Sequence, residues 1–141
     1  MNPDTVWTIL LVEDNPGDVA LFEEAVEVCR LPVRVHTVDH GLEALQFLRR
    51  QGPFADAPRP DVVVLDLNLP VMNGREVLAE MMADPQLQRM PVAVLSTSAI
   101  DQDACALCPP GRSLYFSKTD DFLRLQDIVR QIVDHAAAAS R

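Results

Sequence analysis

The sequence predicts an α/β fold in which a doubly wound, five-stranded parallel sheet is covered by helices on both faces. Val62-Val63-Val64-Leu65 is a continuous run of buried-type residues without polar alternation, which is typical of a strand covered on both sides. Four further apolar runs alternate with helical segments through short connections, and this alternation favours right-handed crossovers between parallel strands. Open sheets of this kind place their chemistry at the carboxyl ends of the strands.

The N-terminal half contains two predicted strand–helix units. The strands are expected at 9–12 and 33–38, and the helices at 16–29 and from 41 to about 50. Pro16-Gly17-Asp18 opens the first helix, because proline is tolerated in a first turn. Residues 51–60 are rich in Pro and Gly and are interpreted as an exposed loop.

The C-terminal half continues the alternation. After the strand that ends at Asp66, a helix is expected from Arg75 to about Ala83, and Pro85 ends it. The remaining predicted elements are a strand at 91–95, a short helix at 101–108, a strand at 114–117 and a last helix that begins at Asp120-Asp121. The last helix has an apolar stripe, and its alanines 136–139 are interpreted as a frayed end.

Length and composition restrict the class of protein. The chain has 141 residues, 48% of them hydrophobic, which fits one domain over 1–141 with a core at about 8–135 and no output domain. The formal net charge is -9 and the pI is about 4.6. Binding to duplex DNA depends mainly on Lys and Arg that neutralise phosphates, so we expect no direct nucleic-acid partner.

Location is predicted from what the sequence lacks. No stretch approaches the roughly 18 apolar residues of a membrane span, and the N-terminus has no basic and apolar signal region, so we expect a soluble, cytoplasmic protein. Three cysteines fit free thiols in a reducing compartment. Cys105 and Cys108 have C-x-x-C spacing but no second ligand pair, and they are interpreted as ordinary small residues.

Reactive side chains follow the predicted strands at one edge of the sheet. Clustered carboxylates from Glu13, Asp14 and Asp66 repel one another unless a cation lies among them, and hard oxygen ligands suit Mg²⁺. Ser96 adds a hydroxyl, and Lys118 is the only lysine among 12 basic residues. A nucleophilic carboxylate, a metal and donors for phosphoryl oxygens are what phosphoryl transfer onto a carboxylate needs.

These residues lie in motifs that resemble the response-regulator receiver domain, the CheY-like, flavodoxin-like (βα)5 fold. The resemblance covers about residues 8–135, with 30 residues from Asp66 to Ser96 and 52 from Asp66 to Lys118. The matching motifs are Leu11-Val12-Glu13-Asp14-Asn15, Val64-Leu65-Asp66-Leu67-Asn68-Leu69-Pro70 with Gly74, Val94-Leu95-Ser96, and Tyr115-Phe116-Ser117-Lys118.

The resemblance implies a two-component response regulator that accepts a phosphoryl group from a histidine kinase onto Asp66 in a Mg²⁺-dependent reaction. By the same resemblance, Glu13, Asp14, Asp66 and the backbone carbonyl of Asn68 surround Mg²⁺. The resemblance also implies that the chain is not an enzyme, except that it catalyses phosphorylation and dephosphorylation of its own aspartate.

Two more roles follow from the resemblance. Ser96 and Lys118 bind the phosphoryl oxygens, and Tyr115 is the aromatic switch residue whose ring moves with the Ser96 hydroxyl. The switch is expected to be read on the surface of residues 101–108, 114–117 and the last helix, through which a homodimer is also predicted. Thr119 replaces a proline that is common in the family, so the shape of that loop is left open.

A narrower similarity is to small stand-alone receivers partnered with phytochrome-type histidine kinases, here a bacteriophytochrome-type sensor. Its cues are Glu-Asp-Asn-Pro-Gly-Asp at 13–18, the loop 51–60 and Ser96-Thr97-Ser98. Two alternatives remain. One is an interaction module that needs no phosphate. The other is a small phosphohydrolase, which usually carries an acid two residues after the nucleophile, where this chain has Asn68.

Overall fold

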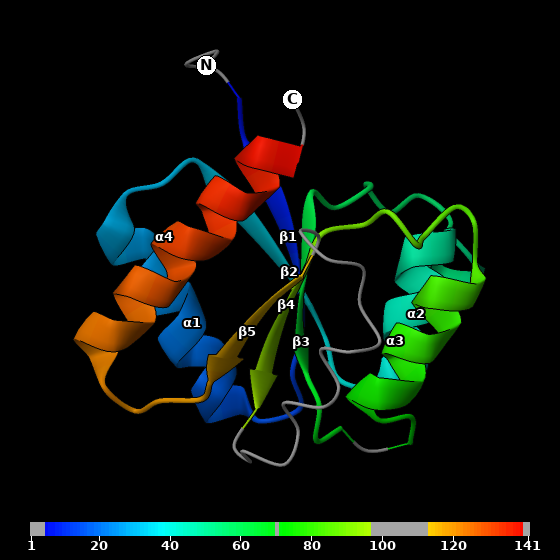
Figure 1. Ribbon diagram of the computed structural model, residues 1–141, viewed down its shortest axis with the longest axis horizontal. Helices are drawn as coiled ribbons and strands as arrows, with labels where there is room; N and C mark the ends of the chain where they lie inside the picture. Colours follow the sequence, from blue (N-terminus) through cyan, green and yellow to red (C-terminus); the bar gives the residue numbers. More distant parts are fainter. Residues whose placement is uncertain (1–4, 70, 97–112, 140–141) are drawn as a thin grey trace.

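A computed structural model describes residues 5–69, 71–96 and 113–139 and contains the predicted sheet (Figure 1). Five parallel strands are arranged in the order β2-β1-β3-β4-β5. The strands are β1 (Trp7–Val12), β2 (Val33–Val38), β3 (Val62–Asp66), β4 (Val92–Ser96) and β5 (Ser113–Ser117). The predicted fold class is therefore confirmed.

Helices cover both faces of this sheet. They are α1 (Pro16–Cys29), α2 (Gly41–Arg49), α3 (Gly74–Ala83) and α4 (Phe122–Ala139), with a 3-10 turn η1 (Gly52–Phe54) after α2. Figure 1 shows α1 and α4 on one side of the sheet and α2 and α3 on the other. The helix predicted at 101–108, including Cys105 and Cys108, lies outside the described residues.

The central strand β3 explains why the sequence run has no polar alternation. Val62 and Val64 belong to the core under α1 and α4, whereas Val63 and Leu65 belong to the core under α2 and α3. All four side chains are fully buried. Because successive residues of a strand point to opposite faces, a strand with helices on both sides must be apolar at every position.

Two local predictions were incomplete. Ala136 and Ala137 are not frayed: α4 continues through Ala139, and both alanines are buried in the core that also contains Trp7. Their short side chains allow close packing there, which composition alone does not indicate.

The loop 51–60 contains the 3-10 turn η1, which brings the centre of the Phe54 ring to 5.5 Å from that of the Phe47 ring. Among the described residues, no helix combines the length and apolarity required to cross a bilayer.

Gly74 holds the carboxyl end of β3 close to α3. A Cβ atom at this position would lie 2.5 Å from the carbonyl oxygen of Asp66 and 2.6 Å from Cα of Leu67, so any larger residue would push the helix away. The Gly74 N–H donates to the carbonyl oxygen of Leu67 at 3.1 Å. The side chain of Asn73 caps α3 by accepting from the Glu76 N–H at 3.0 Å. This helix start therefore fixes the loop that follows Asp66.

Candidate functional site

The parallel register brings the predicted site residues to the same edge of the sheet. Val12 pairs with Leu65, so Glu13 and Asp66 follow neighbouring positions of β1 and β3. Asp66 pairs with Leu95, the residue before Ser96. The Lys118 N–H donates to the Ser96 carbonyl oxygen at 2.8 Å, which fixes the start of the lysine side chain beside β4.

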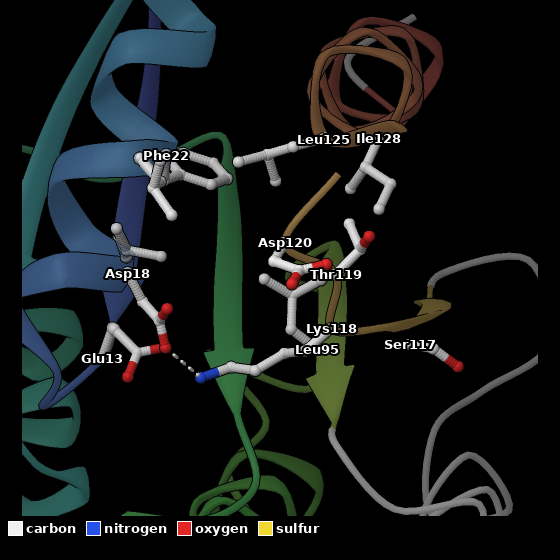
Figure 2. Close-up of a pocket in the computed structure, with 12 residues that line it drawn as sticks. Glu13, Asp18, Phe22, Leu95, Ser117, Lys118, Thr119, Asp120, Leu125 and Ile128 are labelled. Carbon is white, nitrogen blue, oxygen red and sulfur yellow. Dashed lines mark hydrogen bonds and ion pairs between the residues drawn. The ribbon is translucent and has the colours of Figure 1, made fainter. Parts of the chain in front are cut away.

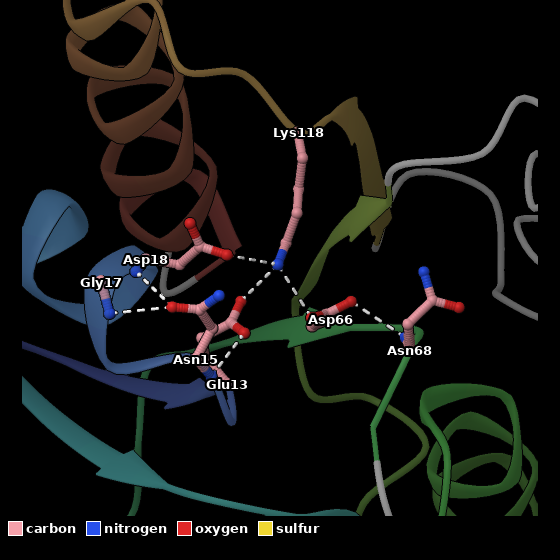
Figure 3. A network of polar contacts seen from close by, with 7 residues as sticks. All are labelled: Glu13, Asn15, Gly17, Asp18, Asp66, Asn68 and Lys118. Carbon is pink, nitrogen blue, oxygen red and sulfur yellow. Dashed lines mark hydrogen bonds and ion pairs between the residues drawn. The ribbon is translucent and has the colours of Figure 1, made fainter.

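The ammonium of Lys118 lies at the centre of this edge (Figure 3). Its Nζ is 2.7 Å from Oε2 of Glu13, 2.9 Å from Oδ2 of Asp66 and 3.0 Å from Oδ2 of Asp18. An ammonium has three N–H donors, so these three carboxylates match its full donor capacity. The side chains of Lys118, Glu13 and Asp66 are only 17%, 3% and 5% exposed, so these three groups are largely shielded from water.

Backbone N–H groups orient the two buried carboxylates. The Asn15 N–H donates to Oε1 of Glu13 at 3.1 Å, and the Asn68 N–H donates to Oδ1 of Asp66 at 2.9 Å. Each carboxylate thus has one oxygen held by the backbone and the other by Lys118. The side chain of Asn68 is exposed. Both carboxylates are therefore held in fixed orientations before any ligand arrives.

Three carboxylates form a group with the chemistry of a divalent-cation site. Glu13, Asp14 and Asp66 each offer an oxygen within 4.8 Å of the others. Glu13 and Asp66 are buried, at 3% and 4% exposure, whereas Asp14 is exposed. Hard carboxylate oxygens at a partly open edge suit Mg²⁺, which keeps several waters. The donor set therefore fits the predicted metal.

The shared environment shifts two pKa values. Burial raises the pKa of the Glu13 carboxyl to about 7, and the hydrogen bond from Lys118 only partly opposes this. Burial alone would lower the pKa of the Lys118 ammonium, but its bonds to Glu13, Asp66 and Asp18 outweigh burial and raise it. The lysine therefore stays charged at neutral pH, while Glu13 is close to its titration midpoint.

Ser96 and Tyr115 lie on the side of the sheet that faces α2 and α3. Ser96 ends β4 and is 1% exposed. Tyr115 pairs with Val94 in the register of β4 and β5 and packs, half-buried, against the core of that face. Side chains two residues apart in a strand share a face, so Ser96 and Tyr115 occupy the same side. This arrangement is compatible with the predicted switch, which stays a prediction.

Asp18 is the site residue that the sequence prediction missed. Residues 15–18 were interpreted as a helix start and as part of the motif at 13–18, but no bond to Lys118 was expected. Asp18 lies in the first turn of α1, which follows the end of β1 at this edge of the sheet. The loop with Thr119 also has a definite shape without the family's proline. Oγ1 of Thr119 accepts from the Asp121 N–H at 3.0 Å, and the Asp121 carboxylate accepts from the Leu123 N–H at 3.0 Å at the start of α4.

Comparison with known proteins agrees with this site. Residues 9–130 match the response regulator receiver domain. The chain is 39% identical over 131 residues to the response regulator Rcp1 of Synechocystis sp., covering 93% of this chain and 88% of that protein.

Two solved structures are also similar. The phosphorylated cyanobacterial phytochrome response regulator RcpA is 43% identical with a TM-score of 0.81, over 92% of this chain and 93% of that one. The Mn²⁺-bound form of Rcp1 is 37% identical with a TM-score of 0.77, over 86% of this chain and 91% of that one. The match to the domain model spans most of the chain and all the clustered carboxylates as well as Lys118, and the chain therefore belongs to the family of response regulator receiver domains.

Proposed function

We propose that Asp66 is the phosphoacceptor of a two-component signalling reaction and that its donor is the phosphohistidine of a sensor kinase. The observation that carries this proposal is the contact of the only lysine with Asp66 and Glu13 at the carboxyl edge of the sheet. A nucleophile for phosphoryl transfer must be oriented and paired with cationic groups that neutralise the transferred charge. Asp66 and Lys118 have that relationship.

Glu13, Asp14 and Asp66 are the side chains that we propose hold Mg²⁺, together with the backbone carbonyl of Asn68. The support is the proximity of the three carboxylates and the Mn²⁺-bound form of the related Rcp1. Bound Mg²⁺ would neutralise the carboxylates and favour the approach of a charged phosphoryl group. Lys118 then supplies the second positive charge.

The proposed transfer forms one bond to phosphorus and breaks another. One carboxylate oxygen of Asp66 forms a bond to phosphorus while the bond from phosphorus to the donor's histidine nitrogen breaks. The electron pair of the broken bond stays on the histidine nitrogen, and with a proton from solvent the histidine leaves as neutral imidazole. Lys118 moves its donors toward the phosphoryl oxygens, and we assign Ser96 the same task from β4. Tyr115 would report that change as the aromatic switch.

The partner that we propose is a phytochrome-type histidine kinase. The support is the similarity to RcpA, which is a cyanobacterial phytochrome response regulator. We place this exchange in the cytoplasm. The chain would pass its signal through protein contacts, including a homodimer formed by residues 101–108, β5 and α4.

The test is phosphorylation by acetyl phosphate or by a phosphorylated phytochrome-type kinase in Mg²⁺. We expect an acid-stable, base-labile adduct on the parent and on Asp84→Asn, which changes an acid of another ion pair, but none on Asp66→Asn. Equal labelling of Asp66→Asn and the parent would overturn the assignment of the phosphoacceptor.

A calorimetric titration with Mg²⁺ separates the phosphate-independent alternative from the proposed reaction. Binding that weakens in Asp66→Asn supports the proposal, whereas no binding together with no adduct favours the interaction module. Fluorescence of Trp7 is a poor substitute. Trp7 begins β1, and Glu13 follows the end of the strand, so six residues at about 3.3 Å each separate them by about 20 Å.

A further inference from the structure

Lys118 has three carboxylate partners, but the proposed reaction needs two of them for other purposes. Glu13 and Asp66 belong to the group of carboxylates that can share a metal ion, and Asp66 is also the proposed phosphoacceptor. Each of these two acids therefore changes its bonding during the reaction. Asp18 is outside that group, although its Oδ2 is 3.0 Å from Nζ of Lys118.

The backbone around Asp18 is fixed independently of the lysine. The side chain of Asn15 caps α1 and accepts from the N–H groups of Gly17 and Asp18 at 2.9 and 3.3 Å. The first turn of a capped helix has little freedom, so the carboxylate of Asp18 is presented to the edge of the sheet from a rigid position. The Asp18 side chain is 42% exposed and therefore open to water on one side.

Lys118 also has space to leave the site. A cavity of about 410 Å³ lies beside it, with Leu21, Phe22 and Leu125 among the residues that line it. Figure 2 shows Lys118 extending along this cavity toward Glu13 and Asp18. A lysine side chain is a flexible four-carbon stem that ends in a compact positive charge. Without a fixed acceptor, the ammonium would sample other positions in this space.

We propose that Asp18 is a positioning residue for phosphoryl transfer, which keeps the ammonium of Lys118 at the phosphoacceptor while Glu13 and Asp66 change partners. This inference rests on the proposed function of Asp66. It assigns to Asp18 no contact with the phosphoryl group. Since its carboxylate is negative, Asp18 does not attract the incoming phosphate. Any increase in the rate of transfer must therefore come from its effect on the position of Lys118.

Two substitutions separate position from charge. Asp18→Ala removes the acceptor, and because positioning errors of about 1 Å can cost 100-fold, we expect phosphorylation by acetyl phosphate to slow about 10- to 100-fold. Asp18→Asn keeps an acceptor oxygen at the same place. It should slow the reaction only about three- to fivefold, since a neutral acceptor bonds an ammonium more weakly.

A matched control is Asp120→Ala. Asp120 lines the same cavity and carries the same charge, but within the described part of the chain the acids bonded to Lys118 are Glu13, Asp18 and Asp66. We expect the parent rate for this variant. If Asp120→Ala slowed the reaction as much as Asp18→Ala, general electrostatics would explain both and the positioning role would be rejected.

The lysine itself provides a readout that does not depend on phosphorylation. Because the chain has a single lysine, selective isotopic labelling of lysine gives one side-chain NMR signal that belongs to Lys118. In Mg²⁺ and beryllium fluoride we expect the parent and Asp18→Asn to give a shifted signal typical of an immobilised side chain. Asp18→Ala should give a signal close to that of a mobile, solvated lysine. Unchanged mobility in Asp18→Ala would overturn the proposal.

Failure of this inference can be told apart from failure of the proposed function. If the parent is not labelled on Asp66, the proposed function fails, whereas the mobility of Lys118 in Mg²⁺ alone still tests the role of Asp18. If the parent is labelled and Asp18→Ala matches it in rate, only the positioning role fails. Circular dichroism melting curves of each variant verify that it is folded before rates are compared.

Discussion

Lys118 and Arg49 each contact more than one carboxylate, and their surroundings differ. Lys118 joins acids from the ends of β1 and β3 and the start of α1. Arg49, near the end of α2, reaches across to α3: its Nη2 is 3.3 Å from Oε2 of Glu80 and its Nε is 3.2 Å from Oδ2 of Asp84. In both clusters a cation contacts carboxylates within hydrogen-bonding distance, although one cation is an ammonium and the other a guanidinium.

Burial distinguishes the two clusters. The side chains of Glu13 and Asp66 are 3% and 5% exposed, against 50% and 21% for Glu80 and Asp84. Burial raises the pKa of Glu13 to about 7, whereas the bond from the Gln86 N–H, followed by those from Arg49, lowers the pKa of Asp84. Burial therefore makes ionisation of Glu13 less favourable, whereas hydrogen bonds make ionisation of Asp84 more favourable.

The largest effect is expected when Lys118 is replaced. Lys118→Met keeps an unbranched side chain of similar size but leaves Glu13 and Asp66 buried without their cation. In Mg²⁺-free buffer we expect the free energy of unfolding to fall by about 3 kcal/mol, since removing one partner of a buried pair leaves an uncompensated charge. Urea unfolding measures this loss.

Added Mg²⁺ should recover part of that stability, because a ligand that binds only the folded chain stabilises it. Phosphorylation should remain strongly impaired in Lys118→Met even at saturating Mg²⁺. A variant as stable as the parent in Mg²⁺-free buffer would show that Lys118 is no more important to the fold than a partly exposed cation such as Arg49.

The comparison also explains which parts of the site could be predicted from sequence. Glu13, Asp66 and Lys118 each adjoin an apolar strand, so the parallel topology alone places them at one edge. Asp18 is on a helix, and its bond to Lys118 spans 100 residues. No local pattern distinguishes it from a solvated helix-start acid. The same applies to Ala136 and Ala137, whose burial depends on what packs against the end of α4.

A change of pH is expected to have an intermediate effect on stability through the carboxyl group of Glu13. The unfolded chain releases this proton near its ordinary pKa of 4.5, whereas the folded protein keeps it up to about pH 7. Folding therefore binds a proton in this interval, and stability from this group is lost as the pH rises through it. In Mg²⁺-free buffer the parent should lose stability relative to Glu13→Gln, which cannot titrate, between about pH 4.5 and 7.

Thermal melting of the parent and Glu13→Gln across this pH range measures the difference in stability between them. Groups that titrate alike in both proteins do not contribute to this difference. Mg²⁺ should reduce the difference at pH 7, because metal binding requires the ionised carboxylate. Parallel pH profiles for the parent and Glu13→Gln would mean that burial does not hold a proton on Glu13, and the contrast with Asp84 would disappear.

The smallest effect is expected at the more exposed cluster, which consists of Arg49, Glu80 and Asp84. Arg49→Ala removes both ion pairs of this cluster but leaves two acids, Glu80 and Asp84, that water can solvate. Exposed pairs contribute little, so we expect the melting temperature to fall by at most about 3 °C, less still in high salt, and phosphorylation of Asp66 to be unchanged. A loss as large as that of Lys118→Met would mean that contact number, and not burial, governs what these clusters do.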